Sequence, residues 1–430
     1  MGKSVSLFAS LLLLLWLTGC GPKQPATPAL YSDITPFLQA APAPLGTKEA
    51  TRLYTDFLAH RYAPWQMEEL NITCEEAAWT YDHYRNRKLI GENLRPIPAE
   101  TLEKWIDNAR FEAFNSLHIR AITTHPTSLR LLPTDKPIFY DPALPGEGFP
   151  FDTNQNSGLK AMTPLLVSHL SRDGGWAFVQ SPFAIGWVRV RDIVALKEAM
   201  AEKIMETPLA VWLDENGPVK DTGNYFLFYA KLGTLFPVES RTDGEYRLAV
   251  VQNCSGIAHF RDAETDACRA EAMPLAMTRE NIARVAERLL DEPYGWGGLY
   301  RDRDCSAMTR DFFAPFGIWL PRNSSAQANV GRKILLKGLE SAEKERLIIE
   351  KGVPFRTLIH LPGHIMLYVG HRNGRAYVMH NLWGIRTEEN GRYIIGKAVI
   401  TDLHPGENLP GVDRDDLLVN RIDSMNIVVE

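Results

Sequence analysis

One cysteine of this chain stands in a setting that suits nucleophilic chemistry. Cys305 lies between Asp304 and Ser306, directly before apolar residues at helical spacing, which are Met308, Phe312, Phe313 and Phe316. A thiol in the first turn of a helix faces unpaired backbone N–H groups, which favour the thiolate. A thiolate is a strong nucleophile, so we expect Cys305 to attack a carbonyl carbon.

The histidine that would serve as the base lies downstream of this cysteine. His364 and His380 each adjoin an apolar run, and Asn373-Gly374 lies between the two runs. An Asn-Gly pair between apolar runs predicts a β-hairpin. We expect His364 to take the thiol proton and His380 to hold its ring in one orientation, as the third member of a triad does.

A strict two-residue turn would place these histidines on opposite faces of the sheet. Such a turn pairs Arg372 with Arg375, which puts His380 opposite Leu367. Because side chains alternate along a strand, His364 would then point away from His380. The triad requires a bulge, a loop of odd length or a lapse of alternation at a strand end, and the sequence leaves these alternatives open.

Together these motifs resemble those of the NlpC/P60 family of cell-wall peptidases. They are Pro-Tyr-Gly-Trp-Gly-Gly at 293–298, Asp-Cys-Ser at 304–306, Leu-Pro-Arg at 320–322 and Gly-His-Ile-Met-Leu-Tyr-Val-Gly at 363–370. The resemblance implies a papain-like fold and cleavage of peptidoglycan stem peptides, typically between D-γ-glutamate and a diamino acid such as meso-diaminopimelate. It also implies the Cys305, His364 and His380 roles given above.

The resemblance assigns further residues around the nucleophile. It implies that Tyr294 supports the active site, and that five residues line the substrate pocket: Asp304, Ser306, Trp296, Arg322 and Ser324. Ala307 stands where the family usually has glycine, and we expect little effect because alanine is a good helix former. No cofactor is implied. Pro362-Gly363 excludes the helix that a zinc pair at the spacing of His360 and His364 would need.

The N-terminus predicts export from the cytoplasm. Lys3 precedes an apolar stretch at 5–17 that is too short to span a bilayer. Leu17-Thr18-Gly19-Cys20 resembles a bacterial lipoprotein signal, which implies cleavage before Cys20 and acylation of that residue. Several acyl chains on Cys20 would anchor the protein stably, facing the periplasm or cell wall. An ordinary secretory signal is the alternative, and it exports the protein as well.

The remaining chain divides into segments of different character. We expect an α+β protein whose papain-like NlpC/P60 domain follows a helical segment and two small SH3-like β-barrels. Strand patterns such as Trp176 to Gln180 and Gly186 to Val190 resemble bacterial SH3 domains. The expected boundaries are 1–19 for the signal peptide, 20–46 for a Pro-rich tether, 47–120 for a helical clip, 121–200 and 201–275 for the SH3-like domains, and 276–430 for the catalytic domain.

Composition limits the partners. The net charge of −5 and the lack of a basic block give no indication of nucleic-acid binding, and we expect none. We expect a monomer that binds stem peptides of the L-Ala-γ-D-Glu-diaminopimelate type. Cys254 and Cys268 could form a disulfide that leaves Cys74 free, or all three could be reduced. Two alternative functions remain: a non-catalytic peptidoglycan-binding lipoprotein, and an amidase or transpeptidase that uses the same triad.

Overall fold

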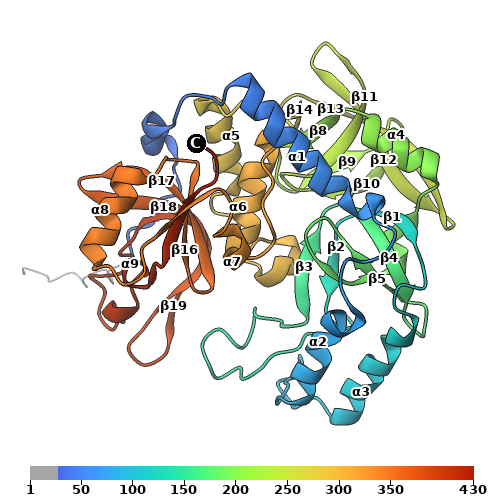
Figure 1. The fold of residues 1–430 in the computed structure, drawn as a ribbon, viewed down its shortest axis with the longest axis horizontal. Coiled ribbons are helices and arrows are strands. Elements are labelled where there is room, and N and C mark those ends of the chain that lie inside the picture. Colours follow the sequence, from blue (N-terminus) through green and yellow to red (C-terminus); the bar gives the residue numbers. More distant parts are fainter. Residues whose placement is uncertain (1–27) are drawn as a thin grey trace, which may run out of the picture.

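The computed structural model describes residues 28–430, which form a helical N-terminal region, two β-sheet modules and a C-terminal α+β domain (Figure 1). The expected signal peptide at 1–19 and the lipidation site Cys20 lie outside the described residues. Within 28–430, no helix combines the length and the apolar character needed to cross a membrane. The mixed α and β architecture confirms the predicted fold class.

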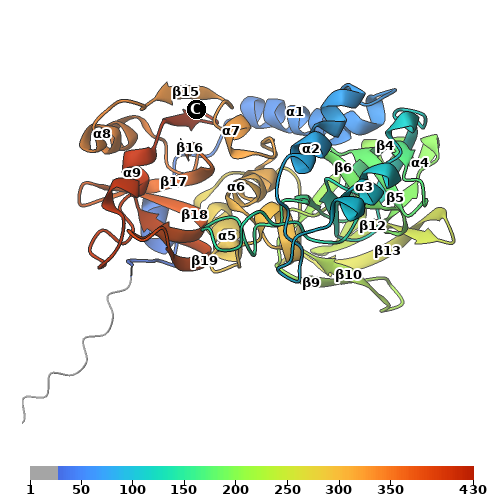
Figure 2. The same ribbon diagram turned by 90° about the horizontal axis from the view of Figure 1, so that it is seen from below.

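Three helices build the N-terminal region: α1 (Thr47–Gln66), α2 (Cys74–Arg85) and α3 (Ala99–Asn108). Thr73 and Glu76 form a capping box at the start of α2, with side-chain to backbone distances of 3.1 and 2.8 Å. Helix α1 runs along the molecule from the C-terminal domain to the sheet modules (Figure 2). Phe57 lies in the core of the C-terminal domain and Trp65 in that of the second module, so α1 connects these parts.

Residues 28–46 pack against the C-terminal domain and do not form a loosely packed tether over that range. Ile34 and Phe37, next to and within the short 3-10 helix η1 (Thr35–Ala40), are buried in the core of that domain. The ring centroid of Phe37 lies 5.1 Å from that of Tyr377. The physical reason for the difference is that two large apolar side chains between the prolines bury their surface on the neighbouring domain.

The first sheet module follows the helices. Its strands are β1 (Ile119–Thr123), β2 (Thr127–Arg130), β3 (Gln155–Leu159), β4 (Pro164–Leu170), β5 (Trp176–Gln180), β6 (Ile185–Arg189) and β7 (Ile193–Ala195). They form an antiparallel sheet in the order β3-β2-β6-β5-β4-β1-β7. The long loop 131–154 between β2 and β3 extends toward the C-terminal domain (Figure 1). This loop matters for the site described below.

Helix α4 (Glu198–Glu206) leads into the second sheet module. Its strands are β8 (Leu209–Trp212), β9 (Gly217–Lys220), β10 (Phe226–Ala230), β11 (Leu235–Thr242), β12 (Glu245–Cys254), β13 (Ile257–Asp266) and β14 (Ala270–Ala272). Five strands pair in the order β13-β12-β11-β8-β14, while β9 and β10 form a separate hairpin. Cys254 and Cys268 of this module are free thiols, as is Cys74 on α2.

The C-terminal domain packs helices against a six-stranded antiparallel sheet in the order β15-β20-β16-β17-β18-β19. The strands are β15 (Arg332–Leu335), β16 (Thr357–Leu361), β17 (His364–Arg372), β18 (Arg375–Arg386), β19 (Arg392–Asp402) and β20 (Ser424–Ile427). The helices are α5 (Arg279–Leu289), α6 (Cys305–Phe313), α7 (Ser324–Gln327), α8 (Ser341–Lys351) and α9 (Leu418–Arg421). Met308 and Phe312 of α6 share a core with Ile365 and Leu367 of β17, so the sheet fixes where α6 begins.

Candidate active site

Cys305 is the first residue of α6, as the sequence predicted. Asp304 caps this helix, because its side chain accepts a hydrogen bond from the backbone N–H of Ala307 at 2.8 Å. The same carboxylate accepts from the backbone N–H of Gly297 at 3.2 Å, which ties the glycine-rich approach to the helix start. The neighbouring backbone of Ile365 and Ser306 acts to lower the pKa of the Cys305 thiol, which favours the thiolate.

Burial nevertheless keeps the resting thiol neutral. Cys305 is 8% exposed, and burial, followed by the Asp304 carboxylate, raises the pKa of its thiol to about 12. Burial, assisted by the Arg421 and His360 side chains, lowers the pKa of His364 to about 4. A neutral imidazole can accept a proton, so the resting pair has the protonation states that a nucleophile and its base require.

The two histidines lie on the same face of the sheet and touch each other. Nε2 of His364 and Nδ1 of His380 are 2.9 Å apart. A bulge in the β17–β18 pairing makes this possible: Gly370 pairs with Tyr377, but Tyr368 pairs with Val378, so one residue of β17 is skipped. Of the three alternatives that the sequence left open, the structure contains the bulge.

Further contacts set which ring nitrogens are available. His380 is fully buried, and its Nε2 lies 3.1 Å from the hydroxyl of Thr401 on β19. Since Nε2 of His364 is occupied by His380, its Nδ1 is the nitrogen left for a thiol. Burial, and then the neighbouring His364, hold the pKa of His380 well below its usual value. His380 is therefore a neutral, oriented partner. Thr401 was missed in the sequence because nothing in its strand distinguishes it from an ordinary buried threonine.

Arg322 holds Asp304, the residue that caps α6. Its guanidinium contacts the two carboxylate oxygens of Asp304 at 2.6 and 3.1 Å, and the hydroxyl of Ser306 at 2.8 Å. Its Nε donates to the Ser157 hydroxyl of the first sheet module at 2.8 Å. Burial would raise the pKa of Asp304, but Arg322 outweighs it and holds that pKa below its usual value. These predicted pocket residues thus form one buried ionic cluster.

His364 lines a groove of about 200 Å³. Tyr294 and Trp296 line it together with Trp383 of β18. Phe151, from the β2–β3 loop, lies over it, with ring centroids 5.2 Å from Trp296 and 5.8 Å from Trp383. The first sheet module therefore closes part of the groove. Phe151 and Trp383 were missed, and only their aromatic character could have drawn attention to them.

Tyr294 and Ser324 differ in what surrounds them. Burial, followed by the charges of Cys305 and Asp304, raises the pKa of Tyr294 well above its usual value, so its hydroxyl stays protonated and able to donate. Ser324 begins α7, whose cap is the side chain of Asn323, and the Ser324 side chain is partly exposed. The structure brings Tyr294 to the groove, whereas Ser324 does not line it.

Four family models match the chain. They are the NLPC_P60 stabilising domain at residues 7–114, an SH3 domain of SH3b1 type at 137–189, an SH3 domain of SH3b2 type at 198–243, and the NlpC/P60 family at 291–390. The last of these includes Cys305, His364 and His380.

Curated relatives match over shorter stretches. A probable endopeptidase of Corynebacterium glutamicum is 34% identical over 82 residues, which are 19% of this chain and 39% of the relative. A gamma-D-glutamyl-L-lysine dipeptidyl-peptidase of Bacillus subtilis is 24% identical over 190 residues, 43% of this chain and 57% of the relative. The chain spans about two fifths of the length of the first curated relatives it matches.

Solved structures match in fold over longer stretches. An NlpC/P60 endopeptidase from Photobacterium damselae subsp. piscicida has a TM-score of 0.83 at 22% identity, covering 94% of this chain and 99% of that one. An NlpC/P60 family protein from Bacillus cereus has a TM-score of 0.50 at 14% identity, covering 72% and 100%. The family models thus give this chain an NlpC/P60 domain at 291–390 that follows two SH3 domains, and the solved structures agree with it in fold.

Proposed function

We propose that this protein is an exported cysteine endopeptidase that hydrolyses the bond between D-γ-glutamate and the diamino acid of peptidoglycan stem peptides. The observation that carries the proposal is the 2.9 Å contact between His364 and His380, on the sheet against which the Cys305 helix packs. The Bacillus subtilis relative is named as a gamma-D-glutamyl-L-lysine dipeptidyl-peptidase, which supports this choice of bond.

The geometry supports the following sequence of steps. The Cys305 thiol gives its proton to Nδ1 of His364 while the sulfur attacks the γ-carbonyl carbon. The backbone N–H of Ser306 and the hydroxyl of Tyr294 are candidate donors to the oxyanion. Breakage of the C–N bond releases the diamino acid, whose amine takes the proton from His364. Water, deprotonated by His364, then hydrolyses the thioester and restores the thiol.

The closed groove indicates the form of the substrate. The β2–β3 loop places Phe151 against Trp296, and Phe149 lies 6.3 Å from Tyr300 between ring centroids. A groove that this loop partly covers accommodates a short peptide with a free N-terminus better than a stem peptide joined to a glycan strand. We therefore assign released stem peptides as substrate.

The experiment that tests the bond uses L-Ala-γ-D-Glu-meso-diaminopimelate and its N-acylated form, with mass spectrometry of the products. We expect wild type to release L-Ala-γ-D-Glu from the free-amine peptide, and Cys305→Ala to release none. Cleavage of both peptides would contradict the assignment to released peptides. Failure to cleave either would reject the bond and favour the amidase, transpeptidase or binding-protein alternatives.

Anchoring through Cys20 is a separate part of the proposal. We expect the mature full-length protein to partition into detergent and its N-terminal peptide to carry acyl chains, which mass spectrometry detects. Cys20→Ala should be exported into the aqueous phase or remain unprocessed. An unmodified N-terminus at Cys20 would reject the anchor without bearing on the peptidase activity.

A further inference from the structure

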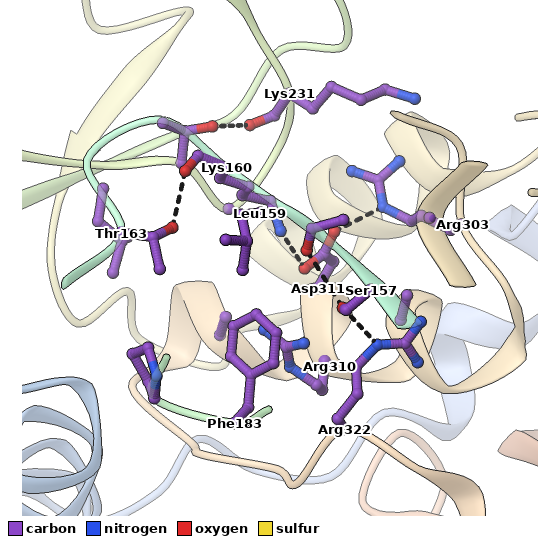
Figure 3. Close-up of a pocket in the computed structure, with 18 of the residues that line it drawn as sticks. Ser157, Leu159, Lys160, Thr163, Phe183, Lys231, Arg303, Arg310, Asp311 and Arg322 are labelled. Atoms are coloured by element: carbon purple, nitrogen blue, oxygen red, sulfur yellow. Dashed lines mark hydrogen bonds and ion pairs between the residues drawn. The ribbon is translucent and has the colours of Figure 1, made fainter. Parts of the chain in front are cut away.

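A second cavity, of about 130 Å³, lies at the junction of the first SH3 domain, the second SH3 domain, α1 and α6 (Figure 3). Ala307, Arg310, Asp311 and Ala314 present one face of α6 to it. Neither Cys305 nor His364 lines it. The opposite face of α6 packs against the six-stranded sheet of the C-terminal domain. This cavity is therefore separate from the groove that Phe151 covers.

Every carboxylate that lines the cavity is already paired. Asp311 accepts from Arg303 at 2.6 Å and also contacts Lys160 (Figure 3). Asp302 lies 3.4 Å from Lys231, which is itself buried. Within residues 28–430, neither of these carboxylates forms an ion pair with Arg310, Arg61 or Arg301, which also line the cavity.

Arg310 is one of three lining arginines, with Arg61 and Arg301, that form no ion pair among residues 28–430. Among residues 28–430 its side chain forms no ion pair and no hydrogen bond, and its guanidinium carbon lies 3.7 Å from the ring centroid of Phe183. Nearby, Nε of Arg61 is buried without a hydrogen-bond partner in the same described part. Burial lowers the pKa of Arg310 to about 10, as expected for a cation with too few acceptors. Arg310 is half-buried, and a partly desolvated guanidinium group without a hydrogen-bond partner favours an anion.

The size and the remaining walls restrict that anion. A volume of about 130 Å³ corresponds to roughly four water molecules at ~30 Å³ each. Apolar side chains, namely Leu159, Phe183, Ile318, Trp319 and Leu320, form much of the lining. A small inorganic anion would leave this apolar surface uncovered. A short aliphatic acid would pair with the guanidinium group and would also cover the apolar surface.

We propose that this cavity binds a small organic carboxylate. Its head group pairs with the guanidinium of Arg310, in the two-pronged geometry that guanidinium and carboxylate share, and its aliphatic part lies against Phe183 and Trp319. The ligand would touch both the first SH3 domain and the helix that begins with Cys305. The ligand therefore lies at the junction between the SH3 domains and the C-terminal domain.

Calorimetric titration of the full-length protein with pentanoate tests the proposal, with pentanamide as the uncharged isostere and inorganic phosphate as the purely ionic probe. We expect pentanoate to bind wild type, and pentanamide and phosphate to bind at least about tenfold more weakly. Carboxymethylation of Cys305 should leave pentanoate binding unchanged, because the cavity does not include that residue.

Arg310→Gln should weaken pentanoate binding by about tenfold or more, whereas Arg279→Gln, the same change at an exposed helix end, should have no effect. If Arg310→Gln does not fold, Arg310→Lys keeps the charge but loses the two-pronged contact and should still weaken binding. Absence of pentanoate binding to wild type would overturn the site. Equal binding of pentanamide would overturn its charge basis, and preferential phosphate binding would overturn the organic ligand.

Discussion

Burial controls the protonation of the Cys305 and His364 pair, and this has a direct consequence for pH dependence. The base must be neutral to accept the thiol proton, so activity is lost when pH falls through the pKa of His364. Burial lowers that pKa to about 4. We therefore expect kcat/KM to persist well below the usual histidine range, with its acid limb nearer pH 4 than the unperturbed value of about 6.5. A pH profile of peptide hydrolysis that falls off around the unperturbed value would contradict this.

In the proposed mechanism His380 acts only through His364, so its variants should reveal a positioning role. His380→Ala removes the 2.9 Å partner of Nε2, and kcat should fall by about 10²-fold with little change in KM. His380→Asn supplies an amide oxygen that can accept from Nε2 and should recover part of the rate. Steady-state kinetics on the tripeptide substrate would check both variants. Equal loss in the two variants would argue against an orienting hydrogen bond.

At the scale of elements, the start of α6 depends on the ionic cluster around Asp304. Arg322→Ala leaves a buried carboxylate without its partner, and we expect a loss of about 3–5 kcal/mol in the free energy of unfolding. Asp304→Asn combined with Arg322→Ala should recover a large part, since no buried charge remains. As a control, the exposed pair of Arg85 with Glu103 is bidentate as well, and Arg85→Ala should cost about 1 kcal/mol or less.

Chemical denaturation followed by the signal of the C-terminal domain would check these values. A loss in Arg322→Ala no larger than that in Arg85→Ala would show that the cluster contributes to the substrate pocket and little to the fold. A fall in the activity of Arg322→Ala at an unchanged free energy of unfolding would lead to the same conclusion.

At the scale of the molecule, the N-terminal segment acts as part of the catalytic domain. Phe37→Ala should destabilise that domain by about 3–5 kcal/mol, because Phe37 is 3% exposed in its core. Gln39→Ala changes an exposed neighbour in the same 3-10 helix and should stay within about 0.5 kcal/mol. Thermal unfolding of the two variants would check this. Equal stability of the two variants would indicate that the segment lies on the surface of the domain without contributing to the stability of the domain.

The β2–β3 loop lines the groove, and under the proposed function it should restrict which peptides enter. Replacing residues 142–149 by a short Gly-Ser link removes Phe149 and the tip that overlies the groove. We expect this variant to cleave the N-acylated tripeptide, which wild type should reject, while still cleaving the free-amine form. Mass spectrometry of both digests would check the result. Continued rejection of the acylated peptide would show that another element closes the groove.

The sequence alone determined the local features of the site. Asp304 is a good N-cap and the apolar residues after Cys305 recur at helical spacing, so the position of the thiol at a helix start could be predicted. The Asn-Gly turn likewise predicted the hairpin that carries His364 and His380. These features depend on residues close together in the chain, which is why they could be read from it.

Tertiary structure decided the rest. The bulge beside Gly370, whose φ of 133° favours glycine and next to which Ala40 packs, puts the two histidines on one face. Thr401 reaches His380 only because β19 pairs with β18. Burial of the N-terminal segment and pairing of Arg322 with Asp304 depend on surfaces distant in sequence. Such contacts depend on how whole helices and strands pack against one another. The local pattern of residues along the chain does not predict them.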